Sequence, residues 1–155
     1  LQLRLRAWKC FKRRQVKGPE MSMYQKPLSG KEYALRENIN EMLDVAEELL
    51  TATGRAVLIG ACDLHYLSCA TGARELPPFD DYFFVGIESE CHDLPIFDDF
   101  RRLCSAGHLQ RSEARINGYA DLVQEKVRQK CREILAKYER TDLDLLECEL
   151  NDESQ

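Results

Sequence analysis

The 155-residue sequence lacks the features of several large functional classes. Its longest apolar run, at residues 56–61, is far shorter than the roughly 20 residues that cross a membrane as a helix. No apolar segment follows the basic N-terminus, so no secretory signal is expected. Gly54, Gly60 and Gly72 are isolated and form no phosphate-binding loop. These absences predict a cytoplasmic protein that neither spans a membrane nor binds nucleotides.

Closely spaced cysteine pairs are also missing. The seven cysteines are an odd number and include no Cys-x-x-Cys pair, which argues for reduced thiols rather than a disulfide framework. A zinc site remains the alternative, because Cys62, His65 and Cys69 would share one helix face and His108 follows Cys104 by four residues. Structural zinc sites usually contain tighter cysteine pairs, and a chain with an apolar core does not need a metal to fold. We therefore predict no cofactor.

No catalytic arrangement can be recognised in the sequence. Cys91, His92 and Asp93 have the composition of a nucleophile, a base and an orienting acid. As neighbours in the sequence, their side chains project in different directions and cannot form the hydrogen-bonded relay of a triad. The prediction is a protein that is not an enzyme.

The formal net charge of −5 is distributed unevenly. Residues 1–20 contain seven basic side chains and one acidic one, whereas the remainder contains 26 acidic and 15 basic side chains. Residues 1–28 are predicted to be a basic leader, disordered or non-native, with a membrane-surface or nucleic-acid tether as the alternative. The acidic body argues against nucleic-acid binding, which depends on lysine and arginine, and suits a basic protein partner.

Two helices are predicted in the first half of the body. Ser29 and Glu32 form a capping-box pair, and the apolar residues that follow recur every three or four positions until the stop expected at Gly54. Residues 55–70 are apolar on most sides and predict a buried helix, with a short strand at residues 57–59 as the alternative.

The following segment is ambiguous. Aromatic and β-branched residues at 81–87 favour a strand, but a lone strand would have no partner, so a helix is preferred. Asp93 and Pro95 predict another short helix, which would end at Gly107. Its inward-facing residues would be Phe97, Phe100, Leu103 and Cys104. An apolar stripe over residues 109–138 predicts a long final helix.

Together these elements predict a mainly α-helical single domain, a bundle of four or five helices, with a short β element near residues 81–87 left open. The helical domain would span residues 29–140, and residues 141–155 would form a solvated acidic tail. The predicted core includes Leu35, Ile39, Leu43, Leu50, Leu58, Leu64, Phe100, Val123 and Ile134.

The most distinctive stretch is the acidic segment, residues 80–99, which holds seven acidic side chains and no lysine or arginine. Solvated carboxylates at helix starts would account for it without any function. A recognition surface for a basic partner, with an aromatic anchor, is the functional interpretation. The candidate partner-binding residues are Asp80, Asp81, Tyr82, Glu88, Glu90, Asp93, Asp98 and Asp99.

The centre of the chain resembles a group of small uncharacterised bacterial helical proteins with an Ile-x-Ser-Glu and Asp-x-Leu-Pro centre. Here the motif residues run from Phe84 through Ile87-Glu88-Ser89-Glu90 and His92-Asp93-Leu94-Pro95, where the aspartate directly precedes the leucine, to Arg101. The resemblance implies a leading helix, a second helix and a long final helix over residues 30–138. Such proteins are similar to immunity proteins, which cover the basic active surface of a partner toxin. This implies a role by analogy and no enzymatic activity.

The functional prediction is therefore a non-catalytic bacterial protein-binding module, immunity- or antitoxin-like, that uses its acidic surface. A zinc-binding protein or metalloenzyme using cysteine and histidine ligands is the alternative. An electrostatic partner interaction should weaken at about 0.5 M salt, where the Debye length is roughly 4 Å.

Overall fold

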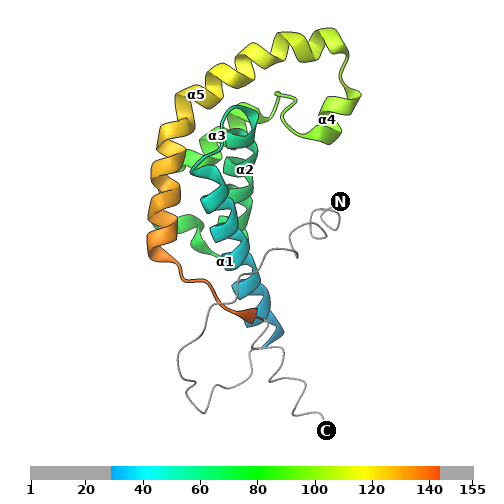
Figure 1. Cartoon of the computed structure of the whole chain (residues 1–155). Helices are drawn as coiled ribbons and strands as arrows, with labels where there is room; N and C mark the ends of the chain where they lie inside the picture. The colour runs from blue at the N-terminus through cyan, green and yellow to red at the C-terminus, as the bar shows by residue number, and fades with distance from the viewer. Residues whose placement is uncertain (1–28, 144–155) are drawn as a thin grey trace.

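The computed structural model describes residues 29–143. Within this range the chain forms five α-helices, one 3-10 helix and no strand. In chain order the elements are α1 (Gly30–Leu49), α2 (Arg55–Ala70), η2 (Ala73–Glu75), α3 (Phe83–Cys91), α4 (Asp98–Leu103) and α5 (Ala106–Lys137). Helix α2 packs against α1, α3 and α5 (Figure 1). The predicted helical bundle of four or five helices is confirmed.

Helix α1 begins where the sequence predicts and ends earlier. Ser29 Oγ accepts a hydrogen bond from Glu32 N at 3.3 Å, and the Glu32 carboxylate accepts one from Ser29 N at 2.7 Å, so the capping box is formed. The helix ends at Leu49 rather than continuing to Gly54. Gly54 instead precedes α2 with φ +57°, a left-handed backbone angle that glycine adopts without steric cost.

The two segments with ambiguous periodicity are both helical. Helix α2 has the predicted bounds, so the strand alternative at residues 57–59 is wrong. The β element considered near residues 81–87 is not formed, because α3 begins at Phe83 and is stabilised by packing on α2. Phe84, Ile87 and Cys91 form its buried side.

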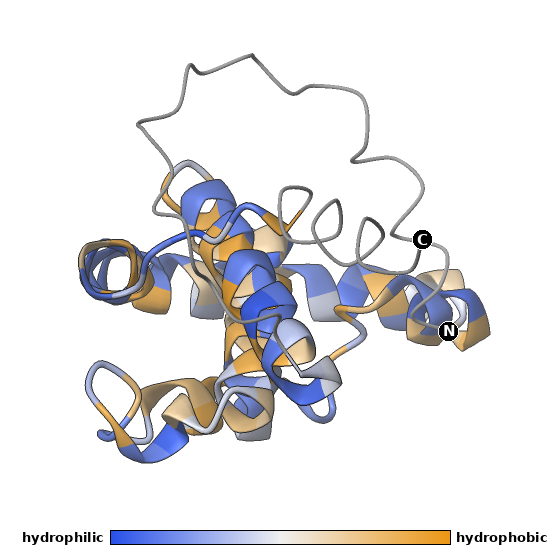
Figure 2. Cartoon of the chain, turned by 90° about the horizontal axis from the view of Figure 1, so that it is seen from below, coloured by the Kyte–Doolittle hydropathy of each residue, from blue (hydrophilic) through white to orange (hydrophobic). Residues whose placement is uncertain are grey.

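The core lies where α1, α2, α3 and α5 meet. Figure 2 shows hydrophobic and hydrophilic residues alternating along the long helices, as expected for helices that bury one side. Five predicted core residues are buried, namely Leu43, Leu58, Leu64, Val123 and Ile134. Ile39 and Leu50 are partly buried against this core. The predictions for Leu35 and Phe100 are wrong, because these side chains are 39% and 40% exposed.

Helix α4 lies outside the core, which corrects the prediction for this segment. The helix begins at Asp98, and none of its residues is buried. Phe97, Phe100 and Leu103 are 44%, 40% and 86% exposed rather than turned inward, and Cys104 is only partly buried. Nor does Gly107 end a helix, since it lies in the first turn of α5.

Helix α5 is longer than the bundle that it covers. Its 32 residues span about 48 Å, twice the length of the 16-residue α2. Its N-terminal part extends past the other helices, and α4 lies beside that extended part (Figure 1). All of its buried residues lie between Ile116 and Ile134, which confirms the predicted apolar stripe over the part that faces the bundle.

After α5 the chain runs along α1 toward the N-terminus of that helix. Asn40 Nδ2 donates to Thr141 O at 2.7 Å, and Thr141 N donates to Asn40 Oδ1 at 2.9 Å. Arg140 Nη1 lies 2.7 Å from Asp44 Oδ1. Thr141, which the sequence assigns to the tail, is thus held against α1. Residues 1–28 and 144–155, with the predicted leader and most of the predicted tail, lie outside the described residues.

Within residues 29–143, no helix has the length and apolar character needed to cross a membrane.

Candidate partner-binding site

The loop that leads into α3 is fixed to α5 by two lysines. Lys130 Nζ donates to Pro78 O at 2.8 Å and lies 2.9 Å from Asp81 Oδ2. The Lys130 side chain is only 11% exposed. About two turns further along α5, Lys137 Nζ donates to Pro77 O. A buried ammonium group is stable only with such partners, so these contacts hold the start of the acidic segment in place.

Asp81 serves this local structure rather than presenting a free carboxylate. Its Oδ1 also accepts a hydrogen bond from Phe83 N at 3.2 Å, and Lys126 Nζ lies 3.8 Å from its Oδ2. Burial acts to raise the pKa of Asp81, but the hydrogen bonds from Lys130 and Phe83 outweigh burial and lower this pKa. Asp81 is therefore a structural anion at the beginning of α3.

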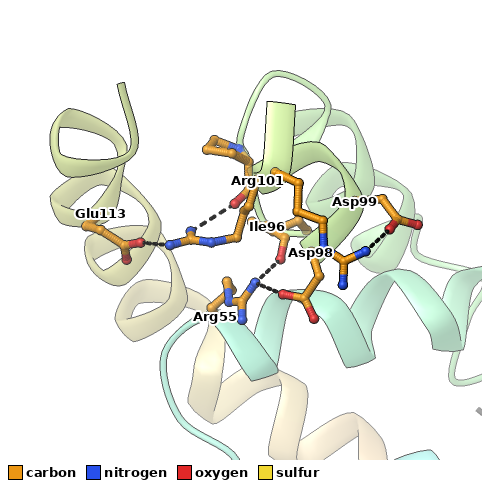
Figure 3. A network of polar contacts seen from close by, with 8 residues as sticks. Arg55, Ile96, Asp98, Asp99, Arg101 and Glu113 are labelled. Carbon is orange, nitrogen blue, oxygen red and sulfur yellow. Dashed lines mark hydrogen bonds and ion pairs between the residues drawn. The ribbon is translucent and has the colours of Figure 1, made fainter. Parts of the chain in front are cut away.

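Two arginines hold the C-terminal end of the acidic segment: Arg55, which precedes the segment in the sequence, and Arg101, which follows it. Arg55 Nη1, at the start of α2, donates to Ile96 O and to Asp98 Oδ1, both at 2.8 Å (Figure 3). The hydrogen bond from Arg55 lowers the pKa of the Asp98 carboxyl. Arg101 Nη1 donates to Pro95 O at 3.1 Å. The turn between α3 and α4 is thereby attached to α2.

Two further ion pairs complete this network. Arg101 Nη2 donates to Glu113 of α5, and Arg102 Nη1 lies 3.3 Å from Asp99 Oδ1 (Figure 3). Asp98 and Asp99 are thus both paired within the fold, as Asp81 is. The structure brings basic side chains to these acids although residues 80–99 contain none.

The other acids of the segment have no lysine or arginine partner in the described chain. Glu88 Oε2 lies 3.1 Å from His65 Nε2 of α2, and Asp93 Oδ1 lies 3.2 Å from His92 Nδ1 in a pair whose side chains are more than 80% exposed. Asp80 and Glu90 are exposed, and no basic side chain within residues 29–143 pairs with either. The predicted acidic candidates therefore divide into those paired with lysine or arginine and those that are not.

Exposed residues line one side of α3. Gly86 and Ser89 lie opposite the buried side of this helix, and the candidate Glu90 is exposed on its flank. Tyr82 precedes them and Asp93 follows them, and we call these five residues the outer face of α3. Tyr82 is 59% exposed and has φ +56°, a left-handed angle that is uncommon and unfavourable for a non-glycine residue.

An open pocket of about 310 Å³ adjoins this face between α3 and α5. Glu90 and Leu94 line it from the α3 side, and Arg115, Tyr119 and Leu122 line it from α5. Leu122 is 78% exposed, although it is a large apolar residue. The pocket thus combines apolar surface with a carboxylate and a guanidinium group.

The inner side of α3 contacts α2 through a pair of thiols. Cys62 of α2 and Cys91 of α3 lie side by side across this contact. The interaction of the two thiols, ahead of burial, raises the pKa of Cys62, whereas the same interaction lowers the pKa of Cys91 against the effect of burial. Tyr119 of α5 lies nearby, and burial, together with Cys91 and Glu90, raises the pKa of its phenol.

The proposed zinc ligands are not gathered at one point. Cys62 faces Cys91, His65 contacts Glu88, and Cys69 is exposed. Cys104 Sγ donates to Phe100 O at 3.4 Å. Within residues 29–143, no three histidine, cysteine, aspartate or glutamate side chains are arranged to hold a metal ion.

Comparison of the chain with protein-family models, with curated proteins and with solved structures finds no match.

The side chains that pair with the acids, and the pairing of the two thiols, do not stand out in the sequence. Lys130 and Arg55 fall within predicted helices, and the sequence suggests Cys62 only as a zinc ligand and Cys91 only as a nucleophile. The available signal was spacing: Cys62 precedes His65 by three residues, and Glu88 precedes Cys91 by three. Two helices that meet in opposite directions would bring such positions together in pairs.

Proposed function

We propose that the protein is a non-catalytic binding module, immunity- or antitoxin-like, that engages a basic protein partner through the outer face of α3. The observation that carries the proposal is that Glu90, on this face, has no basic side chain paired with it in the described chain, whereas Asp81, Asp98 and Asp99 do. Carboxylates that the fold leaves unpaired are available to a partner.

The electrostatic setting supports this choice. The described residues contain 21 acidic and 14 basic side chains, so the bundle itself is negatively charged. Complementary charge speeds the encounter of two proteins and excludes like-charged partners. Paired acids such as Asp98 contribute less to this field at short range, because Arg55 lies against them.

The shape of the outer face also suits close approach by another chain. Gly86 lies in the middle of a helix, where glycine costs about 1 kcal/mol relative to alanine, and no atom lies within 4 Å of the Cβ it lacks. The helix surface is therefore flat at this point. Tyr82 at one end holds an aromatic ring in solvent at the expense of backbone strain, and tyrosine is among the residues that dominate binding energy at interfaces.

A co-purification assay with charge-reversal variants tests the proposal. Tagged full-length protein is incubated with lysate of the organism that encodes it, in low salt and in about 0.5 M salt, and captured proteins are identified by mass spectrometry. We expect a basic protein to be captured stoichiometrically in low salt and lost in high salt. Glu90→Lys should abolish capture in low salt.

Glu41→Lys is the matched control, because Glu41 is an exposed acid of α1 and the substitution changes the net charge by the same amount. Tyr82→Asn should also weaken capture while leaving the fold intact, since asparagine tolerates the left-handed backbone angle. Capture that survives Glu90→Lys, or that is equally lost with Glu41→Lys, would contradict the assignment of the surface.

A further inference from the structure

The contact between α2 and α3 contains two successive side-chain pairs. His65 Nε2 of α2 lies 3.1 Å from Glu88 Oε2 of α3. One turn earlier on α2 and one turn later on α3 are Cys62 and Cys91, whose thiols are near enough to shift each other's pKa. The order of the two pairs shows that the helices run in opposite directions here. The thiol contact is therefore built into the register of the interface.

The two thiols differ in exposure and in chemistry. Cys91 is 4% exposed, whereas Cys62 is only partly buried. The interaction with Cys62 stabilises a thiolate at Cys91 and lowers its pKa, which makes Cys91 the better nucleophile of the pair. Cys131, buried without a thiol neighbour, shows the contrast, because burial raises its pKa to about 12.

The surroundings select the kind of oxidant that can react. Glu88, Glu90 and Asp63 place negative charge near the two sulfurs. An anionic or bulky oxidant such as glutathione disulfide would be repelled by these carboxylates and excluded by the burial of Cys91. Hydrogen peroxide is uncharged and only slightly larger than water, so the carboxylates do not repel it and burial hinders it less than it hinders a larger oxidant.

We propose that Cys62 and Cys91 are a peroxide-sensitive dithiol that closes reversibly into a disulfide between α2 and α3. The Cys91 thiolate attacks one oxygen of hydrogen peroxide, so an S–O bond forms, the O–O bond breaks, and the departing hydroxide takes up the Cys91 proton as water. Cys62 sulfur then attacks the sulfenic sulfur of Cys91, and the S–O bond breaks to release a second water that carries the Cys62 proton.

In this reaction two thiols and one peroxide give one disulfide and two waters, with two electrons passing from sulfur to oxygen. A thiol reductant such as dithiothreitol returns both cysteines to the reduced state by exchange. The new bond would fix α3 to α2 covalently. The proposal stands on the thiol pair alone and does not depend on the partner proposed above.

The first test uses the full-length wild-type protein. The reduced protein is treated with hydrogen peroxide, free thiols are alkylated, and peptides are mapped by mass spectrometry without reduction. We expect a peptide pair linked through Cys62 and Cys91 to be the main cross-linked product and to disappear after dithiothreitol. Recovery of both cysteines as alkylated free thiols, or a main cross-link elsewhere, would overturn the proposal.

Two substitutions then test the order of the steps. In Cys62→Ser the resolving thiol is absent, so Cys91 should accumulate as sulfenic and then sulfinic acid, which mass spectrometry detects as one and two added oxygen atoms on the Cys91 peptide. In Cys69→Ser, which removes an exposed thiol seven residues further along the same helix, the Cys62–Cys91 cross-link should form as in the wild type. A Cys91 that stays reduced in Cys62→Ser would refute the assignment of Cys91 as the attacking thiol.

Discussion

Two glycines that lie inside helices, Gly60 and Gly86, differ in whether the packing around them has room for a side chain. A Cβ added at Gly60 of α2 would lie 2.7 Å from Leu49 Cδ2, and Leu49 is 2% exposed and cannot move away freely. A Cβ added at Gly86 of α3 would meet no atom within 4 Å. Gly60 is thus required for the close approach of α1 and α2, whereas nothing in the packing requires Gly86.

Alanine substitutions at these two positions should therefore change stability in opposite directions. Gly86→Ala should raise the free energy of unfolding by about 0.5–1 kcal/mol, because alanine is the better helix former. Gly60→Ala should lower it by about 1–3 kcal/mol through overpacking against Leu49. Urea unfolding followed by circular dichroism measures both. A destabilised Gly86→Ala would show that the outer face of α3 is already in contact with part of the chain.

The residue scale also shows where sequence patterns stop being informative. Leu43 and Phe100 are both apolar residues at helix-compatible spacing, yet Leu43 is 3% exposed and Phe100 is 40% exposed. The pattern records which side of a helix is apolar but not whether another helix lies opposite it. Among residues 29–143 no helix packs on the apolar residues of α4, and its predicted inward residues face solvent.

At the scale of elements, the loop before α3 depends on a carboxylate that is better ionised in the folded protein. The pKa of Asp81 is lowered by its contacts with Lys130 and Phe83 although burial opposes this. A carboxyl group with a lowered folded-state pKa stabilises the fold above its unfolded pKa of about 4 and loses this contribution as pH falls through the folded pKa.

The difference in unfolding free energy between wild type and Asp81→Asn should accordingly favour the wild type at neutral pH and shrink below about pH 4. Denaturant titrations between neutral and strongly acidic pH measure this difference. Asp80→Asn removes the neighbouring carboxylate, which has no basic partner in the described chain, and should produce little difference at any pH. Equal pH profiles for the two variants would rule out the role of the Lys130 contact.

Elements with strong local signals were predicted well. The capping box fixed the start of α1, and the apolar content of α2 and the stripe of α5 fixed their type. The bounds of α3 and α4 depend on contacts from distant residues. Lys130, which binds Asp81 in the loop before α3, lies 49 positions after it in the sequence. Arg55 of α2 binds the turn before α4. Local periodicity contains no record of such contacts.

For the molecule as a whole, burial is concentrated at one end of α5. Its buried residues begin at Ile116, and the part before it extends toward α4, which buries none of its residues. Local opening of such a region exposes little apolar surface and therefore requires little free energy. Arg55 of α2 attaches this region through its hydrogen bonds to Ile96 O and Asp98 Oδ1, whereas the contact of Arg101 with Glu113 lies within the region.

Hydrogen exchange should therefore divide the molecule into two parts. Amides of α2 and of residues 116–134 in α5 should exchange most slowly, and amides of α4 and of residues 106–115 should exchange much faster. Exchange followed by mass spectrometry of peptides gives both rates in one experiment. Equal protection of α4 and α2 would mean that α4 packs against a surface in solution, for instance in a second copy of the chain.

The hydrogen bonds between Asn40 and Thr141 bring the last described residues beside the first half of α1, so both ends of the described chain emerge at the end of the bundle opposite α4 (Figure 1). A label or surface attachment introduced next to either end would consequently point the same way. Such an attachment would hold the molecule upright with α4 outermost, which makes single-molecule and sensor geometries predictable from this one pair of contacts.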